Sequence, residues 1–297
     1  MDVAYRDKPS DSKVVIIGLP FDCGSDPKRI GARFGPESIR EQSHLISHFD
    51  GRTGINPLDI LKLVDLGDAH EITDDIELAY PAIEQAMLKA IENDAIPISL
   101  GGDGAVALPQ MRALSQKHDD LVVLHIDAHT DAYPIDGYNN ATPFARAFEE
   151  GLINCSKSFH VGRRGSHMMD GIYDYTRQLG YNIIDMGELL EVGITKTFEK
   201  ITQVIGERPV YLCWDMDFFD PSVVPGVCSP TWGGATSREG LQVLKACAGL
   251  EVVAVDINTI SPPHDSAGMS AFLAGNIAYE AMMLMATKQM SVKHLGL

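Results

Sequence analysis

Seven short runs of apolar and β-branched residues recur along the chain, and longer segments of mixed polarity separate them. The runs are KVVIIGLP (13–20), AIPISL (95–100), LVVLHID (121–127), FHVG (159–162), YNIID (181–185), PVYLCWDMD (209–217) and LEVVAVDI (250–257). Nearly continuous apolarity is typical of strands that are buried on both faces, as in a parallel sheet. We therefore predict that these runs form the central strands of the protein.

The intervening segments carry the helical spacing of apolar residues. IELAYPAIEQAMLKAIEND (76–94) and SREGLQVLKACAGL (237–250) show it, and YEAMMLMATKQM (279–290) reads as the buried face of a helix. No repeat or linker interrupts the alternation, which predicts one domain over 1–297. Its fold class is α/β, with three layers (α/β/α) around a mostly parallel central sheet. Ligands bind at the carboxyl ends of the strands in such sheets.

Composition narrows the classes of partner. The net charge is −17, from 41 acidic and 24 basic residues, which argues against nucleic acid and anionic membranes. No apolar run approaches the roughly 20 residues of a membrane span, and because the N-terminal stretch is polar, we do not expect secretion by a signal peptide. The five cysteines are scattered, as expected for free thiols in a reducing compartment. We expect a cytoplasmic protein.

Two acidic clusters follow predicted strands. DAHTD contributes Asp127, His129 and Asp131, and DMD contributes Asp215 and Asp217, which project together because residues two apart in a strand share a face. Converging carboxylates are costly to bury unless a cation neutralises them. Carboxylate and imidazole ligands suit Mn²⁺ first, then Ni²⁺, Fe²⁺ or Co²⁺. The alternative, acids that cap helices or pair with arginine in solvent, explains one cluster more easily than two.

These motifs, with others spread over nearly the whole chain, resemble the ureohydrolase family of arginase, agmatinase and formimidoylglutamase. The resembling stretches are GLPFDCGSDPKRIGARFGPESIRE (18–41), DLGD (65–68), LGGDG (100–104), DAHTD (127–131), HVGRRG (160–165), DMDFFDPSVVPGVCSPTWGG (215–234) and DINTISPPHD (256–265). The resemblance implies an arginase-type fold with a binuclear Mn²⁺ (occasionally Ni²⁺) site. There, a bridging hydroxide attacks a guanidinium or amidine carbon and releases urea or formamide.

The family's ligand pattern is only partly kept. By resemblance, Asp127, His129, Asp215 and Asp217 would complete the second metal position. The first position keeps Asp127, Asp131 and Asp215, but Gly104 stands where the family's G-G-D-H motif supplies a histidine. We therefore expect at most one Mn²⁺ or Ni²⁺ per chain, or none.

His125 is the obvious candidate to replace the missing nitrogen ligand. It shares the strand face of Asp127, but it lies two residues deeper in the predicted strand. We therefore interpret His125 as a buried core histidine.

Two further departures concern catalysis. Asn140, in YNNATPFARA, stands where the family's S-H-G-T-x-F segment has a histidine that is assigned proton transfer to the leaving amine. Asparagine cannot titrate. Thr259 stands where the family has a glutamate that holds the guanidinium, and threonine carries no charge to balance that cation. A metal ligand, a proton-transfer group and a substrate anchor are thus all replaced.

The departures predict a catalytically impaired, non-catalytic subunit of a heteromeric hydrolase of guanidino or amidino C–N bonds. Because the family forms trimers and hexamers, the expected partner is a homologous active ureohydrolase subunit. Heteromeric ureohydrolases of the metformin hydrolase type are the nearest resemblance. Two alternatives stay open. One is an active metal-dependent amidinohydrolase, agmatinase-like, with a rearranged site and an unusual substrate; the other is a stand-alone protein that binds a small guanidino compound.

Overall fold

The sheet is the organising element of the computed structural model, which describes residues 1–297 except 2, 10, 26, 71 and 295–297. It has nine strands in the order β1-β3-β2-β4-β9-β8-β5-β6-β7, and every neighbouring pair is parallel. The strands are β1 (Ala4–Tyr5), β2 (Val14–Gly18), β3 (Val64–Asp68), β4 (Ile96–Leu100), β5 (Val122–Ile126), β6 (Phe159–Arg163), β7 (Asn182–Asp185), β8 (Pro209–Asp215) and β9 (Glu251–Asn258).

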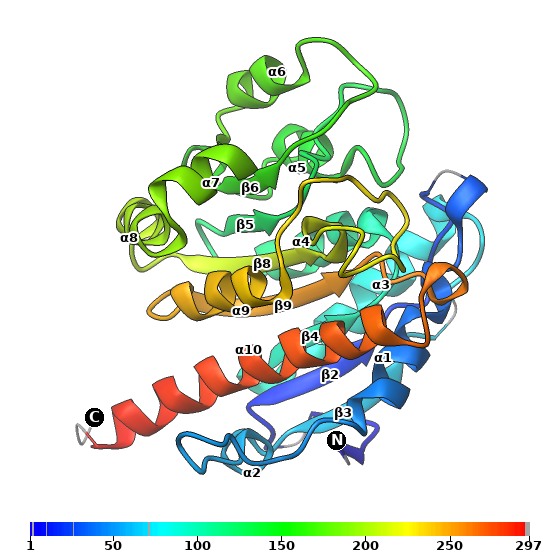
Figure 1. Cartoon of the computed structure of the whole chain (residues 1–297). Coiled ribbons are helices and arrows are strands. Elements are labelled where there is room, and N and C mark those ends of the chain that lie inside the picture. Colours follow the sequence, from blue (N-terminus) through cyan, green and yellow to red (C-terminus); the bar gives the residue numbers. More distant parts are fainter. Residues whose placement is uncertain (2, 10, 26, 71, 295–297) are drawn as a thin grey trace.

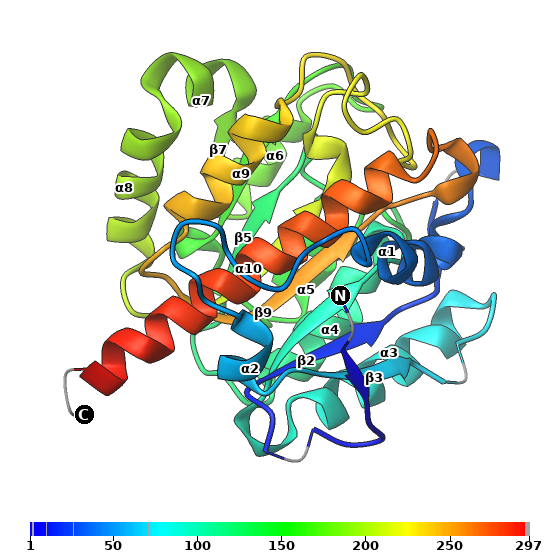
Figure 2. The same ribbon diagram turned by 60° about the horizontal axis from the view of Figure 1, so that its bottom comes forward.

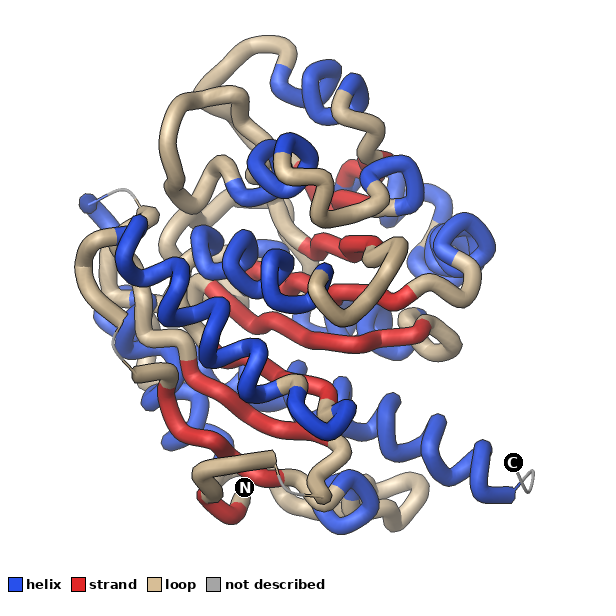
Figure 3. Tube along the Cα trace, turned by 180° about the vertical axis from the view of Figure 1, so that it is seen from behind, coloured by secondary structure: helices blue, strands red, loops and turns tan. Residues whose placement is uncertain are grey.

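Helices cover both faces of this sheet, which gives the three layers of Figures 1 and 3. They are α1 (Gly35–Ser43), α2 (Pro57–Leu61), α3 (Ile76–Ala90), α4 (Ala107–Ser115), α5 (Pro143–Glu149), α6 (Ile172–Gln178), α7 (Met186–Val192), α8 (Ile194–Ile205), α9 (Ser237–Ala246) and α10 (Met269–His294). One hydrophobic core lies between the sheet and α1, α2 and α7–α10, and a second lies between the sheet and α3–α5. In Figure 2, α10 lies across the first face, beside α1 and α9.

The strands divide their side chains between the two cores. In β2, Val14 and Ile16 belong to the first core, whereas Val15 and Ile17 belong to the second. In β5, Leu124 packs in the first core, and His125 points to the opposite face, 4.3 Å from Phe144 of α5 between ring centroids. This alternation follows from the two-residue period of a strand.

Local sequence explains where the helices begin. The side chain of Asp75 caps α3 by accepting hydrogen bonds from the backbone N–H groups of Glu77 and Leu78. Thr236 and Glu239 form a capping box at the start of α9. Such caps satisfy amide groups that the first helical turn leaves unpaired.

The α/β fold class is confirmed: each of the seven predicted strands and each of the three predicted helical segments is present. β1 and β3 were not predicted. β1 is only two residues long and exposed, and β3, between β1 and β2, is half-buried and contains glycine and two aspartates, so neither has an apolar run. The cysteines within the described residues are free, as expected.

The expectation of no apolar run near membrane-span length was wrong for α10. Its segment Met269–Ser291 is long and apolar enough to span a membrane by length and composition. However, 61% of its most apolar window is buried inside the structure, where it packs against α1, α2, α9 and β9. A core helix is apolar for the same reason as a membrane helix, because it is surrounded by apolar side chains.

Candidate metal centre

The sequence-predicted site residues meet in one cavity at the carboxyl edge of the sheet. The loops that follow β4, β5, β6, β8 and β9, five neighbouring strands, enclose a volume of about 370 Å³. Its lining comprises Gly104, His129, Asp131, Tyr133, Asn140, Ala141, Ser166, His167, Met168, Asp215, Asp217, Ser229 and Thr259. The structure therefore brings the three departures from the family pattern and the surviving acids to one place.

Asp127, immediately after β5, lies beneath this cavity and is 1% exposed. Its Oδ1 accepts a 2.5 Å hydrogen bond from the backbone N–H of His129. The Nδ1 atom of His129 is 3.3 Å from Asp127 Oδ1 and 3.1 Å from Asp217 Oδ2. One ligand atom from each of these three residues lies within 4.8 Å of the others, which is close enough for one metal ion to reach all three.

The reason given for pairing Asp215 with Asp217 was wrong. β8 ends at Asp215, and Asp217 belongs to a 3-10 turn, Met216–Phe218. Asp215 caps this turn: its Oδ1 accepts a 2.7 Å hydrogen bond from the backbone N–H of Asp217. The two carboxylates still line the same cavity, because the turn bends the chain around its edge.

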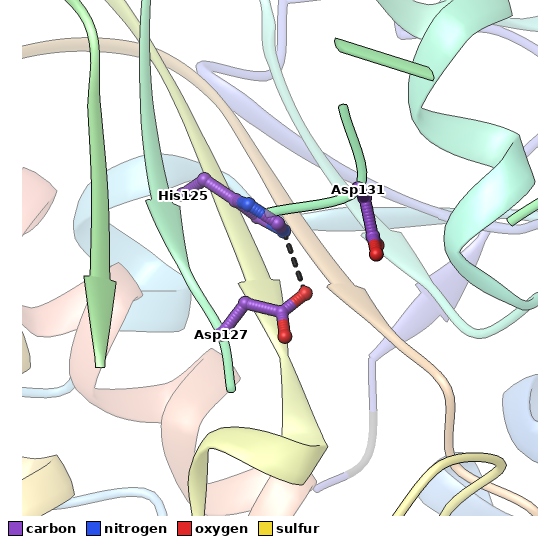
Figure 4. A group of neighbouring side chains, drawn as sticks. All are labelled: His125, Asp127 and Asp131. Atoms are coloured by element: carbon purple, nitrogen blue, oxygen red, sulfur yellow. Dashed lines mark ion pairs between the residues drawn. The ribbon is translucent and has the colours of Figure 1, made fainter. Parts of the chain in front are cut away.

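A second group consists of His125, Asp127 and Asp131, which Figure 4 shows side by side at the end of β5. Asp127 Oδ2 is 2.8 Å from His125 Nε2, yet it accepts no hydrogen bond. The carboxylate of Asp131 makes no hydrogen bond or ion pair with any described residue, although its backbone is held at φ 45°. This end of the site therefore has carboxylate oxygens without donors.

Gly104 faces Asp131 across the cavity. A Cβ atom placed on Gly104 would lie 3.2 Å from Asp131 Oδ2, so a side chain at this position would point at the acids. The turn that presents it, Gly104–Val106, is intact and is capped by Asp103, which accepts a 2.9 Å hydrogen bond from the N–H of Ala105. The backbone is arranged for a ligand that the glycine side chain cannot supply.

Asn140 and Thr259 are also held firmly by their backbones. The N–H of Asn140 donates to Gly24 O at 3.0 Å, and the N–H of Thr259 donates to Gly102 O at 2.7 Å. The hydroxyl of Thr259 donates to Asp215 Oδ1 at 2.5 Å. Thr259 thus contacts one of the predicted metal ligands directly.

Electrostatics favours a cation in this cluster. Burial, together with neighbouring carboxylates, raises the pKa of Asp131, Asp215 and Asp217 above the ordinary value. Burial by itself would raise the pKa of Asp127 and lower the pKa of His129. However, the imidazoles of His125 and His129 lower the pKa of Asp127, and the carboxylates of Asp217 and Asp127 raise the pKa of His129. The acids are thus short of positive charge, and a divalent cation would supply it. The residues present fit at least one metal ion.

Sequence reasoning missed His167, which lines the same cavity. Its ring packs against Tyr173, with centroids 4.6 Å apart. The available signal was its place in the loop after β6, because HVGRRG ends a predicted strand and polar residues there border the ligand edge of the sheet.

Comparison with known proteins defines the class. The sequence model of the arginase family matches residues 12–284. The chain is 32% identical to human mitochondrial guanidino acid hydrolase over 286 residues, which cover 95% of this chain and 81% of that one. It is 34% identical to guanidinopropionase of Pseudomonas aeruginosa over 287 residues, 95% of this chain and 89% of that one.

Solved structures agree. Proclavaminate amidino hydrolase of Streptomyces clavuligerus superposes with a TM-score of 0.91 at 32% identity, covering 96% of this chain and 95% of that one. This chain belongs to the arginase (ureohydrolase) family. The activity of this family is the hydrolysis of guanidino or amidino C–N bonds.

Proposed function

We propose that this chain is a catalytically impaired ureohydrolase, which acts as a non-catalytic structural or regulatory subunit of a heteromeric hydrolase that releases urea. The supporting observation is that Gly104, Asn140 and Thr259 line one cavity with the surviving acids. The departures are therefore not scattered neutral changes, since each bears on the same small volume.

The chemistry of the side chains explains the impairment. Asn140 offers an amide that cannot take up and return a proton, so the leaving amine would depart unassisted. The hydroxyl of Thr259 donates a hydrogen bond to Asp215, and the side chain carries no charge to balance a guanidinium. Removing a proton-transfer group costs about 10²-fold, and removing an electrostatic group costs up to about 10³-fold.

A divalent metal fits the intact position, where Asp127, His129, Asp215 and Asp217 would hold it. Mn²⁺ or Ni²⁺ suits this mixture of carboxylate and imidazole, and by the family pattern the chain holds at most one. When bound, such an ion activates water for attack on carbon. The protein's own acids keep the cavity negative, and Asp131 faces the volume that a cationic guanidino group would enter.

The proposed partner is a homologous active ureohydrolase chain, in a trimer or hexamer. We place the assembly in the cytoplasm, because the net charge of −17 and the free cysteines suit a soluble, reducing environment. Human guanidino acid hydrolase carries "mitochondrial" in its name, so fractionation of the host cell is the direct test.

His167 favours a second candidate function, an active amidinohydrolase with a rearranged site. Its imidazole lines the cavity that also contains Asn140, so it can exchange protons where the family's histidine is missing. In this case the substrate would be neutral or N-substituted, because Thr259 provides a hydroxyl in place of a carboxylate.

The two functions are separated by assaying urea. The purified chain, loaded with Mn²⁺ and separately with Ni²⁺, is incubated with agmatine, arginine and a series of guanidino acids. We expect no urea above background from the chain alone, and urea when it is co-purified with a homologous ureohydrolase from the same host. Urea from the chain alone, abolished by His167→Asn, would establish the second function and overturn the first.

A further inference from the structure

At the end of β5, a histidine nitrogen and a carboxylate oxygen lie close together. His125 Nε2 and Asp127 Oδ2 are 2.8 Å apart, and both residues are 1% exposed. The contact has the length of a hydrogen bond, but Asp127 Oδ2 accepts none within the described residues. A buried carboxylate oxygen without a donor is costly, so a cation within reach of both atoms would stabilise this pair.

The other side of the His125 ring contacts a second imidazole. His125 Nδ1 lies 2.9 Å from Nδ1 of His160, so one of these nitrogens carries the proton that joins them. If His125 donates from Nδ1, its Nε2 is an unprotonated nitrogen that faces Asp127. In this tautomer the proton of His160 lies on its Nε2, which has no partner among the described residues. His125 is then held as metal-binding histidines usually are, with one nitrogen facing the metal position and the other donating its proton to a fixed acceptor.

Asp131 completes the group. One of its carboxylate oxygens lies within 4.8 Å of the ligand atoms of His125 and Asp127, and it has no hydrogen bond or ion pair with a described residue. Ligand atoms about 2.1 Å from a first-row divalent ion, and at right angles to each other, lie about 3.0 Å apart. The 2.8 Å separation between His125 Nε2 and Asp127 Oδ2 matches that of neighbouring ligands.

We propose that His125 supplies the nitrogen ligand that residue 104 lacks, so that His125, Asp127 and Asp131 form a binding position for a divalent transition-metal ion such as Mn²⁺. This replaces the sequence interpretation of His125 as a core residue only. It raises the expected metal content from one ion per chain to two, with Asp127 shared. The inference changes the metal count given with the proposed function but not its catalytic argument, because the losses at Asn140 and Thr259 impair catalysis whether or not two ions bind.

The test measures metal content in place of activity. The metal-free chain is titrated with Mn²⁺ alone, and bound ions are counted by mass spectrometry and by electron paramagnetic resonance. His125→Asn removes Nε2, while its amide can keep the hydrogen bond to His160. We expect two ions in the wild type, and one in this variant, with the second ion bound at least about 100-fold more weakly.

His160→Asn is the matched control, because it makes the same buried substitution on the neighbouring strand and leaves every proposed ligand in place, although it changes the partner of His125 Nδ1. It should keep two ions, with the second ion weakened less than in His125→Asn. In the His125→Asn background, Gly104→His should restore the second ion by supplying the nitrogen from the other side. A wild-type content of one ion or none would overturn the proposal without any variant, and so would two ions in a folded His125→Asn protein.

Discussion

The cavity has two walls that keep very different amounts of the family's chemistry. The surviving wall, at the ends of β5 and β8, consists of Asp127, His129, Asp131, Asp215 and Asp217. The replaced wall, in the loops after β4 and β9 and before α5, consists of Gly104, Asn140 and Thr259. All five family residue types remain on the first wall, and none of the three remains on the second.

The backbone of the replaced wall keeps its structure, although its side chains differ from those of the family. Thr259 has φ 66°, a region that costs a β-branched residue about 1–2 kcal/mol, yet its N–H remains bonded to Gly102 O. Gly104 still starts a capped turn that faces Asp131. The backbone therefore sets the direction of the side chain at each of these positions, whichever residue occupies it. Catalytic residues can be replaced while the backbone structure of the site is kept.

Restoring the replaced wall should have the largest effect. Gly104→His, Asn140→His and Thr259→Glu together should raise urea release by about 10³-fold or more over the unmodified chain, because they return a ligand, a proton-transfer group and an anchor. The assay is urea formation by the Mn²⁺-loaded chain across guanidino substrates. Asp217→Asn in the same background should remove the gain. If the folded triple variant stays inactive, the impairment lies outside the replaced wall.

The surviving wall should carry the metal affinity. Asp127→Asn weakens a carboxylate that reaches both candidate groups, so we expect Mn²⁺ affinity to fall at least about 100-fold. Asn140→Ala, on the replaced wall, should leave the affinity unchanged. Isothermal titration of both metal-free variants measures the contrast. Equal losses in the two variants would erase the distinction between the walls.

The hydrogen bonds of Asp103, which hold the turn at Gly104, should contribute to the free energy of unfolding. Asp103 is fully buried and accepts hydrogen bonds from the N–H of Ala105, the N–H of Gly24 and the hydroxyl of Ser25, each at 2.9 Å. Asp103→Ala leaves these donors without a partner, so the free energy of unfolding should fall by about 2–3 kcal/mol. Chemical denaturation of the metal-free protein measures it. The exposed Asp174→Ala, whose pairing with Arg177 is a surface contact, should change it by less than about 0.5 kcal/mol.

The sequence sufficed to locate this cavity, because its motifs lie where buried apolar runs end. Asp127 follows β5 directly and Asp215 ends β8, so parallel pairing of those strands brings them together. The ligand edge of a parallel sheet follows from chain direction alone. Gly104 was identified as a position near the acids by the resemblance to the family's G-G-D-H motif.

What the sequence did not reveal depends on how the backbone turns after the last strand residue. Whether Asp217 continues β8 or enters a 3-10 turn is decided by the cap that Asp215 provides, which a two-residue period cannot anticipate. The relation of His125 to Asp127 was visible as a shared face, but the missing hydrogen bond required side-chain positions. His167 lies in an exposed loop, where periodicity carries no signal.

The last expected effect is on pH dependence, and it tests whether the buried carboxyl of Asp103 is charged. Burial raises the pKa of Asp103 to about 7, from the model-compound value of 3.8, even though its three hydrogen bonds favour the charged form. Between these values the folded chain holds a proton that the unfolded chain releases. Stability from this group is therefore complete at low pH and declines as pH rises toward 7, by at most about 1.4 kcal/mol per pH unit.

Asp103→Ala removes this dependence, so the loss of stability relative to the wild type should be greater at pH 4.5 than at pH 7. Denaturant titrations of both metal-free proteins at the two pH values measure the difference, in which acids that do not interact with Asp103 contribute equally to both proteins. A loss that is greater at pH 7 would mean that the hydrogen bonds outweigh burial and hold Asp103 ionised. In that case the carboxylate of Asp103, next to Gly104, adds to the negative charge around the cavity, and the replaced wall also contributes to cation binding.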